Sequence, residues 1–196
     1  MEIIKATENQ YEIVRRFYHD LFDGMQESPY DIGWEKDIYP APEFLKTSIA
    51  KGELYIGITE NVIVSAMVLN QQCNDGYKKI KWHTEVSDKD ITVIHALGVH
   101  PAYSGRGYAK AMVLKAFEIA GKNHQKVIRL DVLHGNIPAK KLYTGLGFQY
   151  IDTLKMYYED TGWTIMSFMN ISYNAYFLFS GDCQKRTAAC FHTYHS

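Results

Sequence analysis

One segment of the chain constrains its fold more than any other. The nearly continuous apolar run Ile91–Val99 (ITVIHALGV) leads into a glycine-rich turn, and small and apolar residues then recur at helical spacing. A run this apolar predicts a central strand buried on both faces of a sheet. A turn that opens a helix presents unpaired backbone N–H groups and the positive end of the helix dipole to an anion. The segment therefore predicts a mixed α/β domain whose central strand leads into an anion-binding turn.

The rest of the chain alternates between strand and helix patterns. Thr7 and Gln10 form a capping box, which predicts a helix that starts there and ends before Ser28-Pro29. Residues 71–90 predict a long polar and aromatic loop with one short strand. Strands are predicted at residues 2–6, 53–59, 62–70, 91–99, 126–133, 148–158 and 163–171, and further helices at residues 42–52, 109–121 and 136–146. The expected fold is one domain over residues 1–170, followed by a strand remnant and tail over residues 171–196.

The turn at residues 104–110 allows three interpretations. A nucleotide-kinase phosphate loop ends in Gly-Lys-Ser/Thr, which this turn does not supply. A dinucleotide fingerprint has a third glycine where Lys110 stands and an acidic residue at the end of the next strand, whereas Asp131 lies inside that strand. A plain strand-to-helix turn is the third interpretation.

Two segments together resemble the signature segments of the GNAT family of N-acetyltransferases. The sequence GVHPAYSGRGYAKAMV resembles that family's [QR]-x-x-G-x-[GA] turn, with Ser104 in place of the usual Gln or Arg. The sequence RLDVLHGNIPAKKLYTGLGF matches every fixed position of the pattern N-x-x-A-x-x-L-Y-x-x-x-G-F, at Asn136, Ala139, Leu142, Tyr143, Gly147 and Phe148. The resemblance implies a central, mostly antiparallel sheet of six to seven strands that splays at a cofactor site and is flanked by about four helices.

The resemblance also implies a site for acetyl-CoA, with no metal. The pantetheine arm would pair with Leu97, Gly98 and Val99, and the N–H group of Val99 would face the thioester oxygen. Asn136 would hydrogen-bond the pantetheine amides or serve as the cap of its own helix. The pyrophosphate would lie on the turn, formed by Ser104, Gly105, Arg106, Gly107, Tyr108, Ala109 and Lys110.

Catalytic candidates follow from the same resemblance and from side-chain chemistry. Tyr143 stands where family members protonate the departing thiolate, and its alternative is a packed helix residue. His95 is the first candidate for the base that takes the proton of the amine, and its alternative is a core histidine. Glu85 and His83 could act through water. Asp131 is a further candidate, with a structural role as its alternative.

Four aromatic residues lie in the two loops expected to border the acceptor pocket: Trp34, Tyr39, Tyr77 and Trp82. They could form a wall that binds a cation or pack as a lid. The tail residues Cys183, Cys190, His192 and His195 have a spacing that matches no standard zinc site, so no metal is expected.

Composition excludes several classes of protein. The net charge of −1 gives no overall attraction to nucleic acid or to anionic membranes. Three cysteines without a tight pattern, and a start with no signal-peptide pattern, favour the cytoplasm. The expected function is an N-acetyltransferase that transfers acetyl from acetyl-CoA to a small-molecule or peptide amine by direct attack. The oligomeric state is left open by the sequence, and the resemblance allows a homodimer because members of the family often dimerise. The alternative is a non-catalytic acyl-CoA-binding or regulatory module on the same fold.

Overall fold

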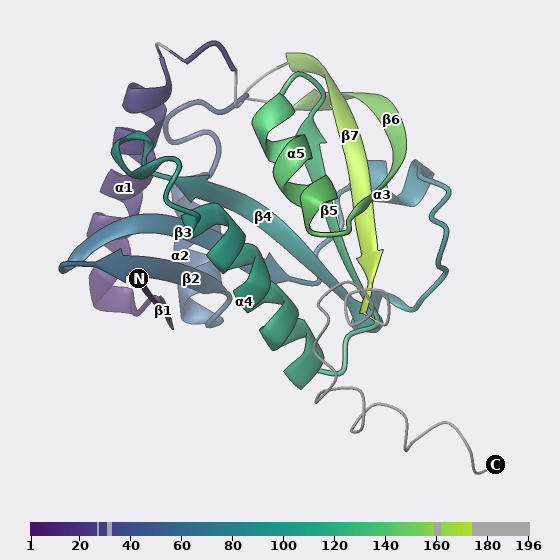
Figure 1. The fold of residues 1–196 in the computed structure, drawn as a ribbon, viewed down its shortest axis with the longest axis horizontal. Coiled ribbons are helices and arrows are strands. Elements are labelled where there is room, and N and C mark those ends of the chain that lie inside the picture. Colours follow the sequence, from purple (N-terminus) through teal and green to yellow (C-terminus); the bar gives the residue numbers. More distant parts are fainter. Residues whose placement is uncertain (27, 31–32, 159–161, 174–196) are drawn as a thin grey trace.

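The computed structural model describes residues 1–26, 28–30, 33–158 and 162–173. A seven-stranded sheet with the order β1-β2-β3-β4-β5-β7-β6 forms its centre (Figure 1). All neighbouring strands are antiparallel except β4 and β5, which run parallel. The strands are β1 (Glu2–Lys5), β2 (Leu54–Thr59), β3 (Val62–Asn70), β4 (Ile91–Val99), β5 (Val127–Leu133), β6 (Gln149–Tyr158) and β7 (Gly162–Ser172). The expected mixed, mostly antiparallel sheet is confirmed.

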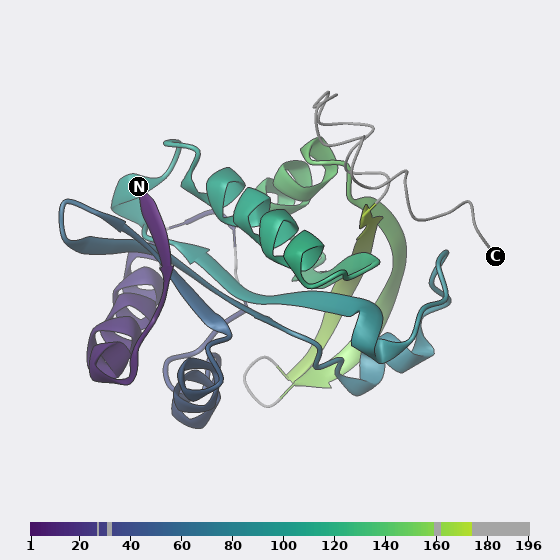
Figure 2. The same ribbon diagram turned by 90° about the horizontal axis from the view of Figure 1, so that it is seen from below.

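Helices cover both faces of the sheet. Figure 2 shows α4 (Tyr108–Lys122) and α5 (Ile137–Gly145) on one face, with α1 (Tyr11–Met25) and α2 (Pro42–Ala50) on the other. Val14, Phe17, Tyr18 and Leu21 lie on the buried side of α1. In the described part of the chain, the longest helices have 15 residues, and none is long and apolar enough to cross a membrane.

The start and end of α1 follow from its sequence. The backbone N–H of Thr7 donates to Oε1 of Gln10 at 3.0 Å, which is one half of the predicted capping box. A short 3₁₀ turn, Glu8–Gln10, then leads into α1. The helix ends at Met25, ahead of Pro29, as the steric restriction on the residue before proline predicts.

The segment between β3 and β4 differs from its prediction. The strand expected within residues 71–90 is absent from this fully described segment, which instead forms the short helix α3 (Asp75–Lys79) and a 3₁₀ turn, Asp88–Asp90. Oδ1 of Asn74 caps α3 by accepting from the N–H groups of Gly76 (2.9 Å) and Tyr77 (3.3 Å). An Asn followed by an acidic residue is a helix-start signal that the sequence did contain.

The sheet opens at its only described parallel pair. β4 and β5 pair only over Ile91–Val93 and Val127–Arg129. β4 then continues to Val99 beside β3, whereas β5 continues beside β7. A bulge lies in β4 at this point, where Ala96 has a φ of 48°. Bulges bend a strand and increase its twist, so the two strands diverge and leave a gap between them.

Candidate functional site

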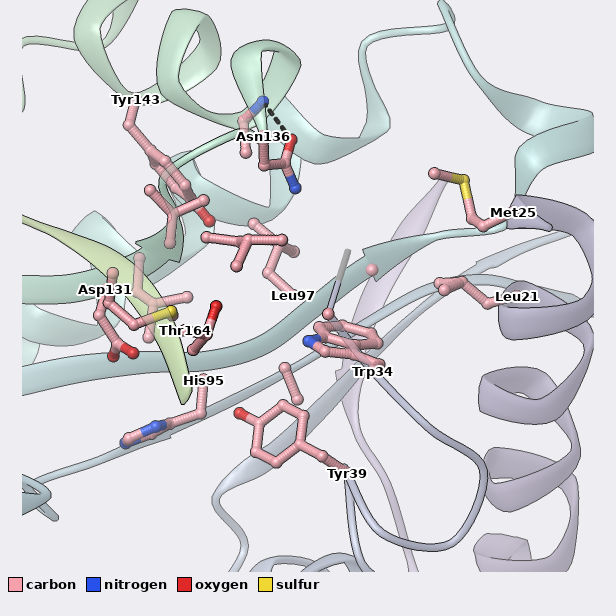
Figure 3. Close-up of a pocket in the computed structure, with 18 of the residues that line it drawn as sticks. Leu21, Met25, Trp34, Tyr39, His95, Leu97, Asp131, Asn136, Tyr143 and Thr164 are labelled. Carbon is pink, nitrogen blue, oxygen red and sulfur yellow. Dashed lines mark hydrogen bonds between the residues drawn. The ribbon is translucent and has the colours of Figure 1, made fainter. Parts of the chain in front are cut away.

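A cavity of about 400 Å³ lies in the gap between the diverging strands (Figure 3). Several elements that are far apart in the sequence form its walls. Strand β4 contributes residues 94–99, and β5 contributes residues 131–133. Helix α1 and the loop after it contribute Leu21, Met25, Gly33, Trp34 and Tyr39. The remaining lining residues are Asn74, Asn136, Ala139, Tyr143, Thr164 and Met166. The cavity thus joins the carboxyl end of β4, where the glycine turn begins, to the side chains of α5 and β7.

The outer edge of β4 presents backbone groups to this gap. The N–H of His100 donates to the carbonyl of Val64 on β3 at 2.9 Å. Because successive N–H groups of an extended chain point to opposite sides, the N–H of Val99 points away from β3. It therefore faces the gap that β5 has left. Leu97, Gly98 and Val99, the residues expected to pair with the pantetheine arm, all line the cavity.

The turn before α4 is open and has the backbone conformation that glycine favours. Gly105 and Gly107 have φ values of 76° and 78°, and a Cβ added at either position would have no neighbour within 4 Å. The hydrogen-bond ladder of α4 starts with the N–H of Ala111, which donates to the carbonyl of Gly107 at 3.0 Å. The first N–H groups of an α-helix have no partner inside the helix, so this turn offers donors for a phosphate.

The side chains of the turn lie around these donors. Ser104, Arg106 and Lys110 are exposed, and the guanidinium group of Arg106 lies 5.1 Å from the centre of the Tyr103 ring. None of the three is among the residues that line the cavity. The turn is therefore polar and exposed, and it lies outside the cavity, whose lining is largely apolar.

Asn136 lies at the start of α5 and lines the cavity. Its Oδ1 accepts a hydrogen bond from the N–H of Ala139 at 3.1 Å, which caps the helix (Figure 3). This is the capping role that the sequence analysis gave as one of two. A side-chain amide also carries two N–H donors, and Asn136 lines the cavity. The residue can therefore cap α5 and donate into the cavity at the same time.

Tyr143 on α5 projects towards the cavity (Figure 3). Only 7% of the residue is exposed, and its ring packs edge-on against Phe148 at a centroid distance of 5.4 Å. Burial raises the pKa of its phenol well above the usual value, and the nearby carboxylate of Asp131 raises this pKa further. The hydroxyl group therefore keeps its proton at neutral and moderately alkaline pH.

His95 on β4 also lines the cavity, and its tautomer is fixed by two neighbours. Its Nε2 lies 2.9 Å from Oδ1 of Asn70, which also accepts from the N–H of Gln72 at 2.9 Å. Since the Gln72 bond identifies this Asn70 atom as the acceptor oxygen, Nε2 of His95 carries a proton. Burial holds the pKa of His95 below its usual value, although Asp131 partly opposes this effect. The imidazole is therefore neutral at pH 7.

Asp131 on β5 is the one carboxylate among the described residues that line the cavity. Its Oδ1 accepts a hydrogen bond from the hydroxyl of Tyr77 at 2.6 Å. This contact orients the carboxyl group, since the Tyr77 side chain is itself buried. Asp131, a further candidate from the sequence, thus lines the same cavity as His95 and Tyr143, whereas Glu85 does not.

Four predicted residues lie outside the cavity lining. The loop prediction placed Tyr77 and Trp82 at the acceptor pocket, yet their rings pack against Phe168 at centroid distances of 5.2 and 6.2 Å. The guanidinium group of Arg129 lies 4.2 Å from the centre of the Trp82 ring. Glu85 and His83 are exposed and lie outside the cavity lining. The reason is α3, which turns residues 71–90 against β5 and β7. The other two aromatics, Trp34 and Tyr39, do line the cavity.

The structure adds lining residues that the sequence analysis missed. Thr164 and Met166 project from β7 into the cavity, and their spacing of two is that of one face of a strand. Leu21 and Met25 come from the last turns of α1, where they continue its apolar stripe. The alternation in β7 and the apolar stripe of α1 are both visible in the sequence. Neither pattern predicts that these side chains face the cavity.

Comparison with known proteins places the chain in a family. The sequence model of the acetyltransferase (GNAT) family matches residues 15–148, more than half of the chain. An uncharacterized N-acetyltransferase of Methanocaldococcus jannaschii is 31% identical over 38% of this chain and 33% of its own length. The N-alpha-acetyltransferase RimI of Mycobacterium tuberculosis is 33% identical over 35% of this chain and 42% of its own length. The matches thus span less than half of these curated relatives.

Solved structures agree on the fold. A GNAT-family acetyltransferase of Streptococcus agalactiae superimposes with a TM-score of 0.72 at 16% identity, over 87% of this chain and 94% of that one. YncA of Salmonella typhimurium, described as an acetyltransferase and solved with its cofactor acetyl-CoA, superimposes with a TM-score of 0.62 at 14% identity, over 88% of this chain and 94% of that one. With this fold and the match of the family model, the chain belongs to the acetyltransferase (GNAT) family.

Proposed function

We propose that the protein transfers the acetyl group of acetyl-CoA to an amine by direct attack of the amine on the bound thioester. One observation supports this proposal most: a single cavity between β4 and β5 brings Tyr143, His95 and Asp131 together beside the end of β4, the strand that leads through the 3₁₀ turn Pro101–Tyr103 into the glycine turn of α4. A long cofactor with a diphosphate at one end and a thioester at the other fits that arrangement. The acetyl-CoA bound by YncA of Salmonella typhimurium supports the same assignment.

The described residues fit such a cofactor. The open glycine turn would take the diphosphate, because a Cβ at Gly105 or Gly107 would fill the space that a phosphate needs. The edge of β4 at Leu97, Gly98 and Val99 would pair with the amides of the pantetheine arm in the manner of an added strand. Asn136 would donate to the same arm from the opposite side.

Acetyl-CoA would supply the activated acyl group, and the chain would supply the polar groups around it. The N–H of Val99 would stabilise the negative charge that develops on the thioester oxygen. As the new C–N bond forms and the C–S bond breaks, Tyr143 would give its proton to the departing sulfur. The amine must lose a proton to attack, and His95 and Asp131 are the two described lining residues that can accept one.

The class of acceptor has two sources of support. The pocket lined by Trp34 and Tyr39 would suit a small amine. RimI of Mycobacterium tuberculosis is named an N-alpha-acetyltransferase, which favours a peptide N-terminus. The competing function, a non-catalytic acyl-CoA-binding module, would use the same turn but would not need a buried, protonated Tyr143.

Acetyl-CoA binding measured by calorimetry tests the assignment. We expect micromolar-range binding by the wild type and none by Gly107→Glu, whose carboxylate would stand where the diphosphate lies. Gly162→Glu is the matched control, because Gly162 also has a positive φ (63°) and open space around it but lies in the β6–β7 hairpin. A wild type that ignores acetyl-CoA overturns the proposal, and equal loss in both variants would assign the effect to backbone strain.

Thiol release in the presence of amines separates the enzyme from the binding module. Turnover with any amine supports the transferase. Binding without turnover across small amines and peptide N-termini favours the module instead.

A further inference from the structure

We infer that the acceptor is a cationic amine on an aromatic or apolar body, with no carboxylate or phosphate next to the amine. This inference rests on the proposed acetyl transfer, because it names the substrate class of the same cavity. Charged and aromatic side chains are distributed around the cavity in a way that favours such an acceptor.

The described residues that line the cavity offer negative charge and no positive charge. Asp131 is the one acidic residue among the described lining residues, and none of these residues is a lysine or an arginine. His95 does not supply a cation, because burial keeps it neutral at pH 7. An ammonium group that enters the cavity meets a carboxylate of opposite charge, whereas an anion meets a carboxylate of the same charge.

Two basic side chains next to the loop that carries Trp34 and Tyr39 are already paired with acidic ones. The guanidinium group of Arg15 makes two hydrogen bonds to Asp37, at 2.8 and 2.6 Å. The ammonium group of Lys36 lies 2.6 Å from Asp23. Neither of these two cations is among the residues that line the cavity.

Aromatic and apolar side chains form the wall opposite Asp131. The rings of Trp34 and Tyr39 lie edge-to-face at a centroid distance of 5.6 Å, and both side chains border the cavity (Figure 3). Trp34 is held from behind by Tyr18, at a centroid distance of 6.0 Å. Leu21 and Met25 extend this wall. Such a surface binds an apolar body through burial and can also attract a cation to the ring faces.

The acceptor chemistry can come from two sources. A small arylalkylamine has the cation and the apolar body and no acid group. A peptide N-terminus with an apolar first residue also has an ammonium group, an apolar body and no adjacent acid. The α-carboxyl group of its first residue forms a neutral peptide bond. A free amino acid has a carboxylate beside the amine, and that group would be buried without a countercharge.

Three acceptors of one skeleton test the inference: phenethylamine, L-phenylalaninamide and L-phenylalanine. We expect kcat/KM for thiol release to be lower for phenylalanine than for the better of the other two by roughly tenfold or more. A larger value for phenethylamine than for the amide indicates a small amine as the source, and the reverse indicates a peptide N-terminus. Phenylalanine turned over as well as the better of the other two overturns the inference but leaves acetyl transfer in place.

Binding provides a readout that does not depend on turnover. Calorimetric titration of the three compounds into the protein saturated with CoA should show the same order. Should none be acetylated, the proposed function is in question, and binding alone then decides the inference: phenylalanine binding as tightly as the better of the other two overturns it.

A charge-adding variant tests the cause of the preference. Thr164 lines the cavity from β7, so Thr164→Lys should raise the kcat/KM ratio of phenylalanine to phenethylamine several-fold. Thr164→Met is the matched control, because it adds a chain of comparable length without charge. An equal change of the ratio in both variants would overturn the electrostatic explanation.

Discussion

The hydroxyl of Tyr18 donates a hydrogen bond to the backbone carbonyl of Ala96 across a distance of 2.9 Å. Tyr18 lies on the buried side of α1, and Ala96 is the residue of β4 whose φ of 48° marks the bulge. Positive φ is uncommon and strained for a residue with a Cβ. The contact therefore ties the helix on one face of the sheet to the strand position at which the site opens.

Removing this hydroxyl should destabilise the fold. In Tyr18→Phe the buried carbonyl of Ala96 loses its donor, which should lower the free energy of unfolding by about 1–3 kcal/mol. Urea denaturation measures this change. Tyr150→Phe is the control, since it removes an exposed hydroxyl that bonds Thr153 at 2.7 Å, and it should have little effect. Equal stability of Tyr18→Phe and wild type would mean that water or a relaxed backbone replaces the bond.

Sequence patterns were sufficient for most of this architecture. The apolar run Ile91–Val99 was predicted as a central strand, and it is one. Its glycine turn, together with the pattern from Asn136 to Phe148, indicated the family, because both segments depend on local backbone requirements. Leu97, Gly98, Val99, Asn136 and Tyr143 were also expected at the site, and the structure brings all of them to one cavity.

Features that depend on tertiary packing were not predictable. The bulge at Ala96 could not be read from the sequence, because alanine has no preference for positive φ. The aromatic residues Tyr77 and Trp82 are as suitable for a pocket wall as Trp34 and Tyr39 are, but the short helix α3 places them against Phe168. The place of Asp131 at the site was not predictable for a similar reason. It lines the same cavity as Tyr143 only because β4 and β5 diverge.

Tyr143→Phe should lower turnover much more than acetyl-CoA affinity. The substitution keeps the packing against Phe148 and removes the one proton that the buried phenol can give to the departing sulfur. General acid catalysis typically contributes about 10²–10⁴-fold, so kcat should fall by about 10²-fold while the dissociation constant for acetyl-CoA changes little. Steady-state kinetics and calorimetry measure the two quantities.

Tyr108→Phe is the control for that experiment. Tyr108 begins α4, and it is expected to contact the cofactor only through its backbone, so both quantities should stay close to wild type. Unchanged kcat in Tyr143→Phe would remove Tyr143 from the mechanism.

His95→Gln should change the acidic limb of the pH–rate profile. Because burial lowers the pKa of His95, wild-type kcat/KM should fall as the pH drops below 6.5 and the imidazole becomes protonated. Glutamine can still bond Asn70 but does not titrate, so this limb should disappear and the maximum rate should fall. A limb that survives in His95→Gln and disappears in Asp131→Asn would assign the base to Asp131.

The same histidine should make stability depend on pH. The pKa of His95 is lowered in the folded state relative to its usual value of 6.5. Below pH 6.5 the unfolded chain therefore binds a proton that the folded chain resists, and stability falls as the pH falls. The free energy of unfolding of wild type should decrease more between pH 7 and pH 5 than that of His95→Gln. Parallel curves for the two proteins would contradict the buried, neutral imidazole.

Asp37→Asn should weaken acceptor binding without affecting acetyl-CoA. Hydrogen bonds from Arg15 and His19 hold the pKa of the Asp37 carboxyl far below its usual value, so the contact remains charged throughout the physiological pH range. Through it, α1 holds the loop that carries Trp34 and Tyr39. Asparagine tolerates the positive φ of 59° at this position but lacks the charge. We expect KM for the acceptor to rise several-fold, with an unchanged dissociation constant for acetyl-CoA.

Lys36→Met provides the matched comparison for Asp37→Asn, because it breaks the neighbouring ion pair with Asp23 and leaves the Arg15–Asp37 contact intact. This variant should keep acceptor KM closer to wild type, since only one bond is lost and both of its partners are exposed. If the two variants raise KM equally, the loop depends on both ion pairs alike and not on the Arg15–Asp37 contact in particular. If Asp37→Asn leaves KM unchanged, the position of Trp34 and Tyr39 does not depend on this contact, and their packing against Tyr18 is sufficient to hold the aromatic wall.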